Sequence, residues 1–322
     1  MIEVKNLTKR YGKNLAVDDL NFTVQDNEIY GFLGPNGAGK STTMNIMTGY
    51  LSTDEGEVLI NGHSIFDEPE EAKALIGYLP EQPPLYVDMT PYEYLMFVAE
   101  LKKIAKEERK DAIEKAMEKT GVTEVKNRLI KNLSKGYRQR VGFAEAILGE
   151  PPVIILDEPM VGLDPKQIIE IRQLIRDLGK SHTVILSSHI LSEISEVADT
   201  VMIISKGKLV ALDSTQNLEE KLLKTNTYNI EVRCSLEKAR EVIEKISGLT
   251  ISEQKEIDAQ NSKLVLTTES TEDFRDKLFF AFADAKVAIT TIEKKAASLE
   301  EVFLELTDSG QDEPEESEED DD

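Results

Sequence analysis

The sequence is poor in the features that mark a secreted or membrane-spanning protein. Its 322 residues include a single cysteine, Cys234, which excludes an intrachain disulfide framework and fits a reducing cytosol. No window of 18 residues is free of charged side chains, so no segment is expected to span a bilayer by itself. The first residues, MIEVKNLTKRYGKN, lack the apolar stretch of a signal peptide. If this chain serves a membrane, another chain must supply the membrane span.

Positive charge is also scarce. The chain has 38 Lys and Arg against 61 Asp and Glu, which gives a formal net charge of −23. Ten of these carboxylates lie in the last fifteen residues, Asp308 to Asp322, which contain no Lys or Arg and are predicted to form a disordered acidic tail. The acidic balance argues against nucleic acid as a partner, because binding phosphate backbones requires clustered cations.

Short apolar runs alternate with helical periods over the first two thirds of the chain. MIEVKNL, NFTVQ and EIYGFL are typical of strands, and so are the later runs PVIILDE, HTVILSS and DTVMIIS, which helical stretches separate. This alternation predicts a parallel sheet with crossover helices. Residues 84–149 instead show helical spacing of apolar residues and are predicted to form an inserted helical subdomain. KGK at residues 206–208 predicts a hairpin turn.

The pattern changes after a predicted helical linker near Leu218 to Lys224. Residues 226–307 are predicted to form a strand, a helix, two strands, a helix and a strand, followed by a last helix at SLEEVFLELT. This order is typical of a small α+β ferredoxin-like accessory domain. The predicted organisation is therefore one domain at residues 1–222, the accessory domain at 226–307 and the acidic tail at 308–322.

The segment GPNGAGKST follows the strand IYGFL and opens a helix, which is the context of a phosphate-binding loop. Its glycines let backbone N–H groups turn inward around phosphate oxygens, and the helix directs its positive end at the same anion. Lys40 is expected to reach the β- and γ-phosphates of ATP, and the Ser41 hydroxyl to ligate Mg²⁺. The alternative is a glycine-rich turn that happens to precede a lysine. The predicted nucleotide-binding residues of the loop are Gly34, Pro35, Asn36, Gly37, Ala38, Gly39, Lys40, Ser41 and Thr42.

A second acidic segment is needed to complete a metal site. VIILDE is an apolar strand that ends in two carboxylates, at the edge where ligands bind in open α/β sheets. Asp157 is expected to hold Mg²⁺ through water, and Glu158 to orient or deprotonate the attacking water. Taken alone, such a strand end is usually only a solvated turn, but together with the phosphate loop it predicts hydrolysis.

Taken in order, the motifs resemble those of the nucleotide-binding subunits of ABC transporters. The order is the phosphate loop, LPEQPPL, LSKGYRQR, VIILDEP, VGLDP and ILSSHIL. The resemblance covers about Met1 to Leu222 and depends on all of these motifs together. It implies an α/β P-loop NTPase with a parallel core sheet, an N-terminal antiparallel β part and an inserted helical subdomain.

The resemblance also gives a role to LSKGYRQR, which packs three cations, a glycine and a tyrosine between apolar segments. In this family the corresponding loop closes the nucleotide site of a second subunit in a head-to-tail dimer. Ser134 and the backbone of Gly136 are therefore implied to contact the γ-phosphate bound on the other chain. The sequence departs from the common form LSGGQ at Lys135 and Tyr137. Lys135 either adds a cation near phosphate or lies on the surface.

Four further residues receive roles only through the resemblance. Tyr11 resembles the aromatic on which adenine stacks, unless it is ordinary packing at a strand end. Gln82 resembles the glutamine that senses Mg²⁺ and the attacking water and links to the helical subdomain, unless it is a plain loop amide. His189 resembles the switch histidine that hydrogen-bonds the γ-phosphate and positions the catalytic glutamate. Asp164 resembles the loop that couples the two sites, although Asp before Pro is also a common turn.

The implied protein is an ATP-hydrolysing subunit at the cytoplasmic face of the membrane. It is expected to dimerise on ATP with a second copy or a close homologue and to drive export through a separately encoded transmembrane permease. LSKGYRQR with a small C-terminal appendage is similar to subunits paired with short export permeases. One alternative is a soluble ABC-type ATPase that remodels a ribosome or a nucleic-acid complex. Another is a regulatory module that holds ATP without turnover, although Glu158 and His189 argue against it.

Overall fold

The computed structural model describes residues 1–217, 226–258, 261–268, 270 and 272–296. The described chain divides into two compact units, the first ending at Thr215 and the second beginning at Gln216. The helices predicted at residues 218–224 and 298–307 and the tail predicted at 308–322 lie outside the described residues. The domain boundary near residues 222–226 therefore stays a prediction.

An antiparallel sheet forms the N-terminal part of the first unit. Its strands are β1 (Ile2–Tyr11), β2 (Asn14–Val24), β4 (Glu55–Ile60) and β5 (His63–Ser64). Their order in the sheet is β2-β1-β4-β5. Buried and exposed positions alternate along the second half of β2, as expected for a sheet with one buried face.

A six-stranded sheet forms the centre of the same unit. Its strands are β3 (Ile29–Leu33), β6 (Ile76–Leu79), β7 (Val153–Leu156), β8 (Thr183–Ser188), β9 (Thr200–Ser205) and β10 (Lys208–Ser214). The order is β10-β9-β3-β8-β7-β6, and every neighbouring pair is parallel except β10 with β9. Every residue of β3, β7 and β8 is buried, which explains why these strands are mostly apolar. The predicted parallel sheet is thus confirmed.

The hairpin predicted at KGK is also present. Ser205 pairs with Lys208, so β9 and β10 are joined by two residues. Both of them, Lys206 at φ 48° and Gly207 at φ 79°, have the positive φ that favours a tight hairpin.

One apolar core lies between the two sheets. It contains residues of β1, β2 and β4 together with residues of the central strands and of helix α1 (Lys40–Met47), which follows β3. Phe22 of β2 and Phe32 of β3 meet there with ring centroids 6.1 Å apart. The turn between β3 and α1 packs against this core through Ala38.

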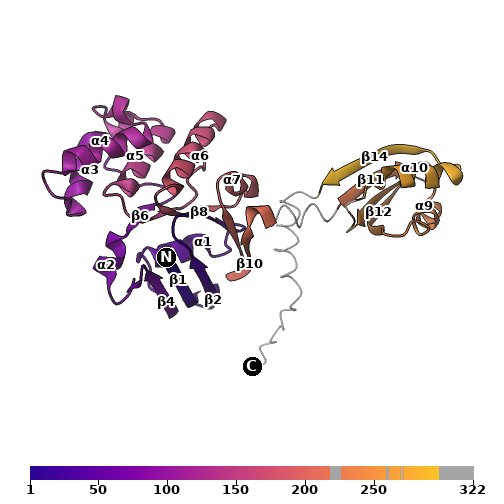
Figure 1. The fold of residues 1–322 in the computed structure, drawn as a ribbon, viewed down its shortest axis with the longest axis horizontal. Helices are drawn as coiled ribbons and strands as arrows, with labels where there is room; N and C mark the ends of the chain where they lie inside the picture. Colours follow the sequence, from indigo (N-terminus) through magenta and orange to yellow (C-terminus); the bar gives the residue numbers. More distant parts are fainter. Residues whose placement is uncertain (218–225, 259–260, 269, 271, 297–322) are drawn as a thin grey trace, which may run out of the picture. The chain divides into compact units, whose positions relative to one another are not determined.

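Three helices form the predicted insertion. They are α3 (Pro91–Leu101), α4 (Arg109–Thr120) and α5 (Lys135–Ile147), and they lie together at the far side of the first unit from β1, β2 and β4 (Figure 1). Thr90 and Glu93 form a capping box that starts α3. Three other helices connect strands of the sheets, namely α2 (Pro69–Ala74), α6 (Pro165–Gly179) and α7 (Leu191–Ser195).

The second unit has its own sheet and core. Its elements are β11 (Asn226–Val232), α9 (Leu236–Ile243), β12 (Thr250–Asp258), β13 (Asn261–Thr268), α10 (Arg275–Asp284) and β14 (Ile289–Ala296). They follow the predicted order, and the antiparallel sheet runs β12-β13-β11-β14. Tyr228, Phe274 and Phe282 are buried in the core, and the Tyr228 hydroxyl accepts from the Phe274 N–H at 3.0 Å. The ferredoxin-like class of this unit stays a prediction.

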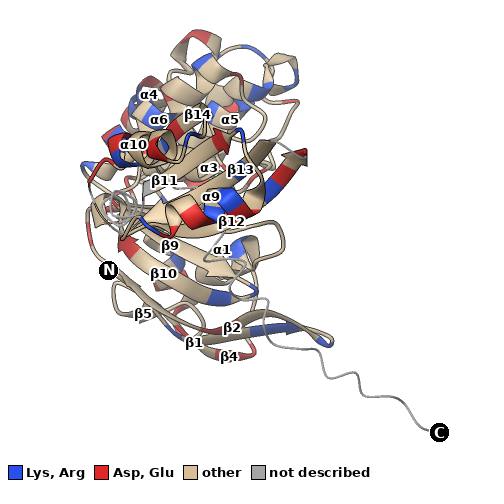
Figure 2. Cartoon of the chain, turned by 90° about the vertical axis from the view of Figure 1, so that its right-hand side faces the viewer, with Lys and Arg blue, Asp and Glu red and all other residues tan. Residues whose placement is uncertain are grey.

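Charges of both signs share several helices of the chain. Lys and Arg alternate with Asp and Glu along α4, α9 and α10 (Figure 2). Such interspersed charge suits solvated helix faces.

Helix α10 offers a test of the second core. Phe282→Ala removes a fully buried ring and should lower the free energy of unfolding of this unit by about 3–5 kcal/mol. Hydrogen exchange read by mass spectrometry should then be faster over residues 226–296 and unchanged over residues 2–215. The matched control is Phe280→Ala on the same helix, which is 64% exposed and should cost less than about 0.5 kcal/mol. Equal effects of the two substitutions would contradict the packing of α10.

Candidate functional site

The loop between β3 and α1 is shaped by glycines that other residues cannot replace. Gly37 and Gly39 have φ of 81° and 102°, a region that L side chains rarely adopt. A Cβ at Gly39 would lie 2.4 Å from the Ala16 carbonyl oxygen, and one at Gly34 would lie 2.5 Å from the Ile204 carbonyl oxygen. A Cβ at Gly37 would meet nothing, so that stretch of loop faces open space. The loop is therefore held against β2 and β9 while its concave side remains available.

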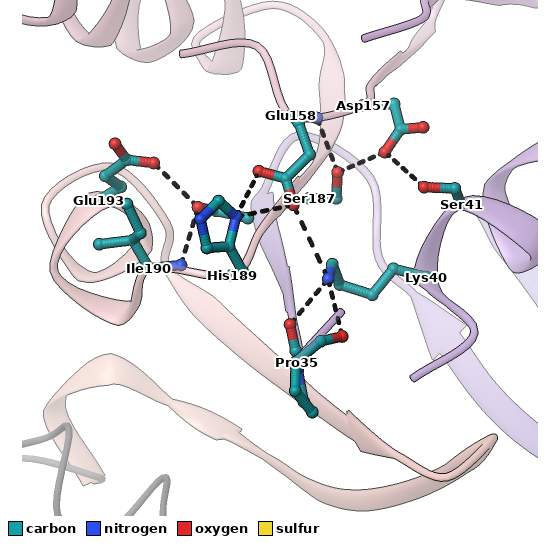
Figure 3. A network of polar contacts seen from close by, with 11 residues as sticks. Pro35, Lys40, Ser41, Asp157, Glu158, Ser187, His189, Ile190 and Glu193 are labelled. Carbon is teal, nitrogen blue, oxygen red and sulfur yellow. Dashed lines mark hydrogen bonds and ion pairs between the residues drawn. The ribbon is translucent and has the colours of Figure 1, made fainter. Parts of the chain in front are cut away.

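Lys40 begins α1 and directs its ammonium back into this loop (Figure 3). Its Nζ donates to the carbonyl oxygens of Gly34 at 2.7 Å and Pro35 at 3.2 Å and lies 3.7 Å from Glu158 Oε1. Lys40 is only 6% exposed. Burial lowers the pKa of Lys40, while the carboxylates of Glu158 and Asp157 oppose that shift by favouring the ammonium.

Asp157 follows β7 and receives two hydroxyl groups on one oxygen. Its Oδ1 accepts from Ser187 Oγ at 2.7 Å and from Ser41 Oγ at 3.3 Å, and the carboxylate is 5% exposed. Neighbouring ligands of an octahedral Mg²⁺ are about 2.9 Å apart. The Ser41 and Asp157 oxygens are thus the right type, and nearly the right spacing, for adjacent positions around a hydrated Mg²⁺. No cluster of three or more His, Cys, Asp or Glu suits a metal within the described ranges, but Mg²⁺ needs only one or two protein oxygens beside phosphates and water.

Glu158 is held in an uncommon backbone conformation. Its φ is 46°, and its N–H donates to Ser187 Oγ at 2.7 Å. Nδ1 of His189, the residue after β8, lies 3.0 Å from Glu158 Oε2 and 3.2 Å from Oε1. Between Lys40 and His189 the carboxylate has a defined direction, as a general base requires (Figure 3).

A cavity of about 650 Å³ joins the loop, Lys40, Ser41, Glu158 and His189. It is lined by Tyr11, Asn14, Ala16, Asn36, Gly37, Gly39, Lys40, Ser41, Thr42, Glu81, Glu158, Val161 and His189. Most of the predicted phosphate loop, Glu158 and His189 thus meet at one place, although they come from three separate stretches of the chain. Tyr11 lines the cavity and is 48% exposed, so it is not part of the apolar core.

Gln82 does not line this cavity. It borders a neighbouring cavity of about 620 Å³ together with Tyr50, Tyr78, Glu145 and Asp157. Glu81 borders both cavities. The chain after β6 therefore brings Glu81 rather than Gln82 to the phosphate loop, while Gln82 shares a cavity with Asp157, the carboxylate predicted to hold Mg²⁺.

Ser134 and Gly136 lie at the start of α5, away from the phosphate loop of the same chain. Ser134 is the N-cap residue of α5 and accepts from the Tyr137 N–H at 3.3 Å. Gly136 borders a third cavity, of about 410 Å³, which Asp164 also lines. Asp164 is itself the N-cap of α6 and accepts from the Gln167 N–H at 2.9 Å. Within one chain, Ser134 and Asp164 thus have ordinary capping roles.

Lys135 lies on the surface, and its ammonium points at the loop that follows Glu158. A Cβ added to Gly162, which has φ of 70°, would be 2.1 Å from Lys135 Nζ. Both alternatives given for Lys135, a cation near phosphate and a surface residue, remain compatible with this position.

The sequence interpretation missed the two serines before His189. Ser187 joins Asp157 to the Glu158 amide, and Ser188 Oγ donates to Glu193 Oε2 at 2.8 Å and accepts from the Ile190 N–H at 3.0 Å. The available signal was a pair of hydroxyls at the end of an otherwise apolar strand, TVILSS. It gains meaning only when β8 is known to be the neighbour of β7.

Comparisons with known proteins agree with this geometry. A family model described as ABC transporter matches residues 17–161. Over 315 residues, which are 95% of this chain and 96% of that protein, the chain is 35% identical to the uncharacterized ABC transporter ATP-binding protein YhcH of Bacillus subtilis (strain 168). It is 42% identical over 212 residues to the bacitracin transport ATP-binding protein BcrA of Bacillus licheniformis, covering 65% of this chain and 68% of that protein. The dimeric structure of MJ0796, a bacterial ABC transporter cassette, is similar with a TM-score of 0.61 and 27% identity over 67% of this chain and 99% of that chain.

The glycine loop gives a direct test of the site. Gly39→Ala should weaken ATP binding by at least about tenfold, because the new methyl group would collide with the Ala16 carbonyl and move the loop. Isothermal titration measures the affinity. Gly62→Ala is the matched control, since Gly62 also has a positive φ, 87°, but open space around it in the turn between β4 and β5. If both variants bind ATP as the unmodified chain does, the close approach at Gly39 is not what shapes the loop.

Proposed function

The chain belongs to the ATP-binding proteins of ABC transporters and so binds and hydrolyses ATP, and from this premise we propose that two copies close on ATP and drive transport through a separate membrane permease. The observation that carries the proposal is the meeting of Lys40, Ser41, Glu158 and His189 at one cavity beside the phosphate loop, with the Asp157 carboxylate in contact with Ser41.

In the proposed reaction the chain's own residues bind the triphosphate and direct a water molecule. Backbone N–H groups of the loop and Lys40 hold the β- and γ-phosphates once the ammonium leaves its loop carbonyls. Ser41 and Asp157 would hold Mg²⁺, whose contribution when bound is to neutralise phosphate charge. Tyr11 would stack on adenine at the cavity mouth.

Glu158 is proposed as the general base. A water oxygen attacks the γ-phosphorus, the bond from that phosphorus to the bridging oxygen of ADP breaks, and the Glu158 carboxylate accepts the proton of the water. His189 Nδ1 lies 3.0 Å from this carboxylate and would keep it aimed, and the ring would also hydrogen-bond the γ-phosphate. Gln82, which lines the neighbouring cavity with Asp157, would sense Mg²⁺ and the attacking water and link the site to the helical subdomain.

A second copy would complete the site. Gly136 lines a different cavity from the phosphate loop, and Ser134 caps the same helix, so the two residues would serve a nucleotide only from another subunit. The similarity to a dimeric cassette supports this arrangement. Closing on ATP would exclude bulk solvent from the site and leave only the attacking water, and loss of the γ-phosphate would remove the anchor that both subunits share.

The proposed membrane partner would dock on the groove that Gln82 shares with Tyr50. Tyr50 is 79% exposed there, which leaves a large apolar ring available to another protein. In the described part of the chain no helix combines the length and apolar character needed to cross a membrane. BcrA, a relative named for bacitracin transport, supports transport as the function, and export is the proposed direction. The subunit would then be peripheral, at the cytoplasmic face of the membrane.

Mixing two inactive variants tests the shared site. Lys40→Ala should abolish ATP binding by its own loop, and Ser134→Arg should block closure on the partner's nucleotide. A 1:1 mixture should regain roughly one quarter of the unmodified ATPase rate, because random pairing leaves one intact composite site in half of the dimers. Steady-state phosphate release measures the rate.

The proposed dimer would be wrong if each variant alone hydrolysed ATP at the unmodified rate, or if mixing restored nothing. The Lys40→Ala, Ser134→Arg double variant is the control, since its mixture with Lys40→Ala contains no intact Lys40 and should stay inactive.

Retention by membranes tests the proposed partner. Tyr50→Glu should reduce, by about tenfold or more, the amount of chain bound to membranes that contain the permease, because it replaces the exposed aromatic ring by a charge. Leu212→Glu on β10, an exposed residue that does not line the groove, is the control and should bind normally. Retention of both variants at the unmodified level would show that the groove is not the docking surface.

A further inference from the structure

Ser187 is a buried hydroxyl with two short hydrogen bonds to the two acidic residues of the site. It is 0% exposed, its Oγ donates to Asp157 Oδ1 at 2.7 Å, and the same Oγ accepts from the Glu158 N–H at 2.7 Å (Figure 3). Strand β8 lies between β3 and β7, so its end reaches the residues that follow β7.

The hydrogen bond from Glu158 fixes the backbone at the point where β7 ends. The ladder between β7 and β8 stops at Leu156 and Leu186, and the next amide, that of Asp157, donates to the Leu79 carbonyl on the other side. The Glu158 N–H is therefore left without a strand partner in a buried place and requires another acceptor. Ser187 supplies it, and so supports the positive φ of Glu158 that turns its carboxylate toward Lys40 and His189.

The hydrogen bond to Asp157 fixes the other carboxylate. Ser187 makes the shorter of the two hydroxyl contacts to Oδ1, at 2.7 Å against 3.3 Å for Ser41. A serine hydroxyl has one donor and two acceptor positions, so one atom can hold a carboxylate and an amide at once. Alanine can do neither.

We propose that Ser187 is a positioning residue for hydrolysis, which sets the Asp157 carboxylate for Mg²⁺ and the Glu158 carboxylate for the attacking water through a single oxygen. The inference rests on the roles proposed above for these two residues. It predicts that Ser187 contributes to turnover and to the effect of Mg²⁺, but not to the grip of the phosphate loop on the nucleotide.

Ser187→Ala in the full chain is the test. The ATPase kcat should fall about tenfold to a hundredfold, the range expected for the loss of buried hydrogen bonds to charged or strained groups, while KM for ATP changes less than about threefold. ATP affinity measured in EDTA should match that of the unmodified chain within about twofold. The gain in ATP affinity on adding Mg²⁺ should be smaller than in the unmodified chain. Ser187→Thr, which keeps the hydroxyl, should restore most of kcat.

Ser64→Ala is the matched control. Ser64 is 7% exposed and also accepts two backbone N–H groups, those of Phe66 and Asp67, but it lies on β5 away from the site. It should shift the unfolding temperature without changing kcat or the Mg²⁺ effect. This separates loss of stability from loss of positioning.

The outcomes are distinct. If Mg²⁺ does not raise the ATP affinity of the unmodified chain, the proposed metal site itself is wrong, and the inference falls with it. If Mg²⁺ does so and Ser187→Ala keeps kcat and the Mg²⁺ effect within about twofold of the unmodified chain, the proposed role of Ser187 alone is overturned. The same holds if Ser187→Ala loses ATP binding in EDTA as strongly as it loses kcat, since the serine would then only maintain the fold.

Discussion

The register of three parallel strands determines where the chemistry of this protein can occur. β3 and β8 pair Leu33 with Ser188, and β7 and β8 pair Leu156 with Leu186, so all three strands end at nearly the same level. The phosphate loop after β3, the carboxylates after β7 and the polar end of β8 therefore emerge side by side, although 116 residues separate Ser41 from Asp157. Parallel strands need long crossovers, and one of these contains the helices α3, α4 and α5 without disturbing that edge.

The same convergence creates an electrostatic constraint. Two carboxylates, Asp157 and Glu158, are nearly buried at a place that must also accept a triphosphate, and like charges at short distance repel strongly in a medium of low dielectric. The site meets this constraint with fixed donors. Lys40 faces Glu158, and the hydroxyls of Ser187 and Ser41 face Asp157, so each acidic group has a partner before a nucleotide arrives. Preorganised donors of this kind need little rearrangement during the reaction.

The sequence alone was sufficient for features that depend on neighbouring residues. The spacing of Gly34, Gly39 and Lys40 and the apolar run before Asp157 indicated the loop and the parallel sheet, and family membership confirmed the ATPase. Features that depend on which strands are neighbours were out of reach. Ser187 is an unremarkable residue of TVILSS until β8 is placed beside β7. The direction of a side chain in a loop was equally hidden, because Glu81 and Gln82 are adjacent in sequence yet only Glu81 lines the nucleotide cavity.

The chemistry of phosphoryl transfer explains why one chain would need another. In the transition state, charge spreads over three equatorial oxygens of the transferred group, and donors must meet it from more than one side. Among the described residues that line the cavity, Lys40 is the one Lys or Arg, and it comes from the same side as the loop. The start of α5, with its first-turn N–H groups and the Ser134 hydroxyl, is the type of anion-binding element that is missing, and it borders a different cavity of its own chain. A head-to-tail pair would bring the two together, so the polar groups that the loop alone lacks are those that a second copy carries.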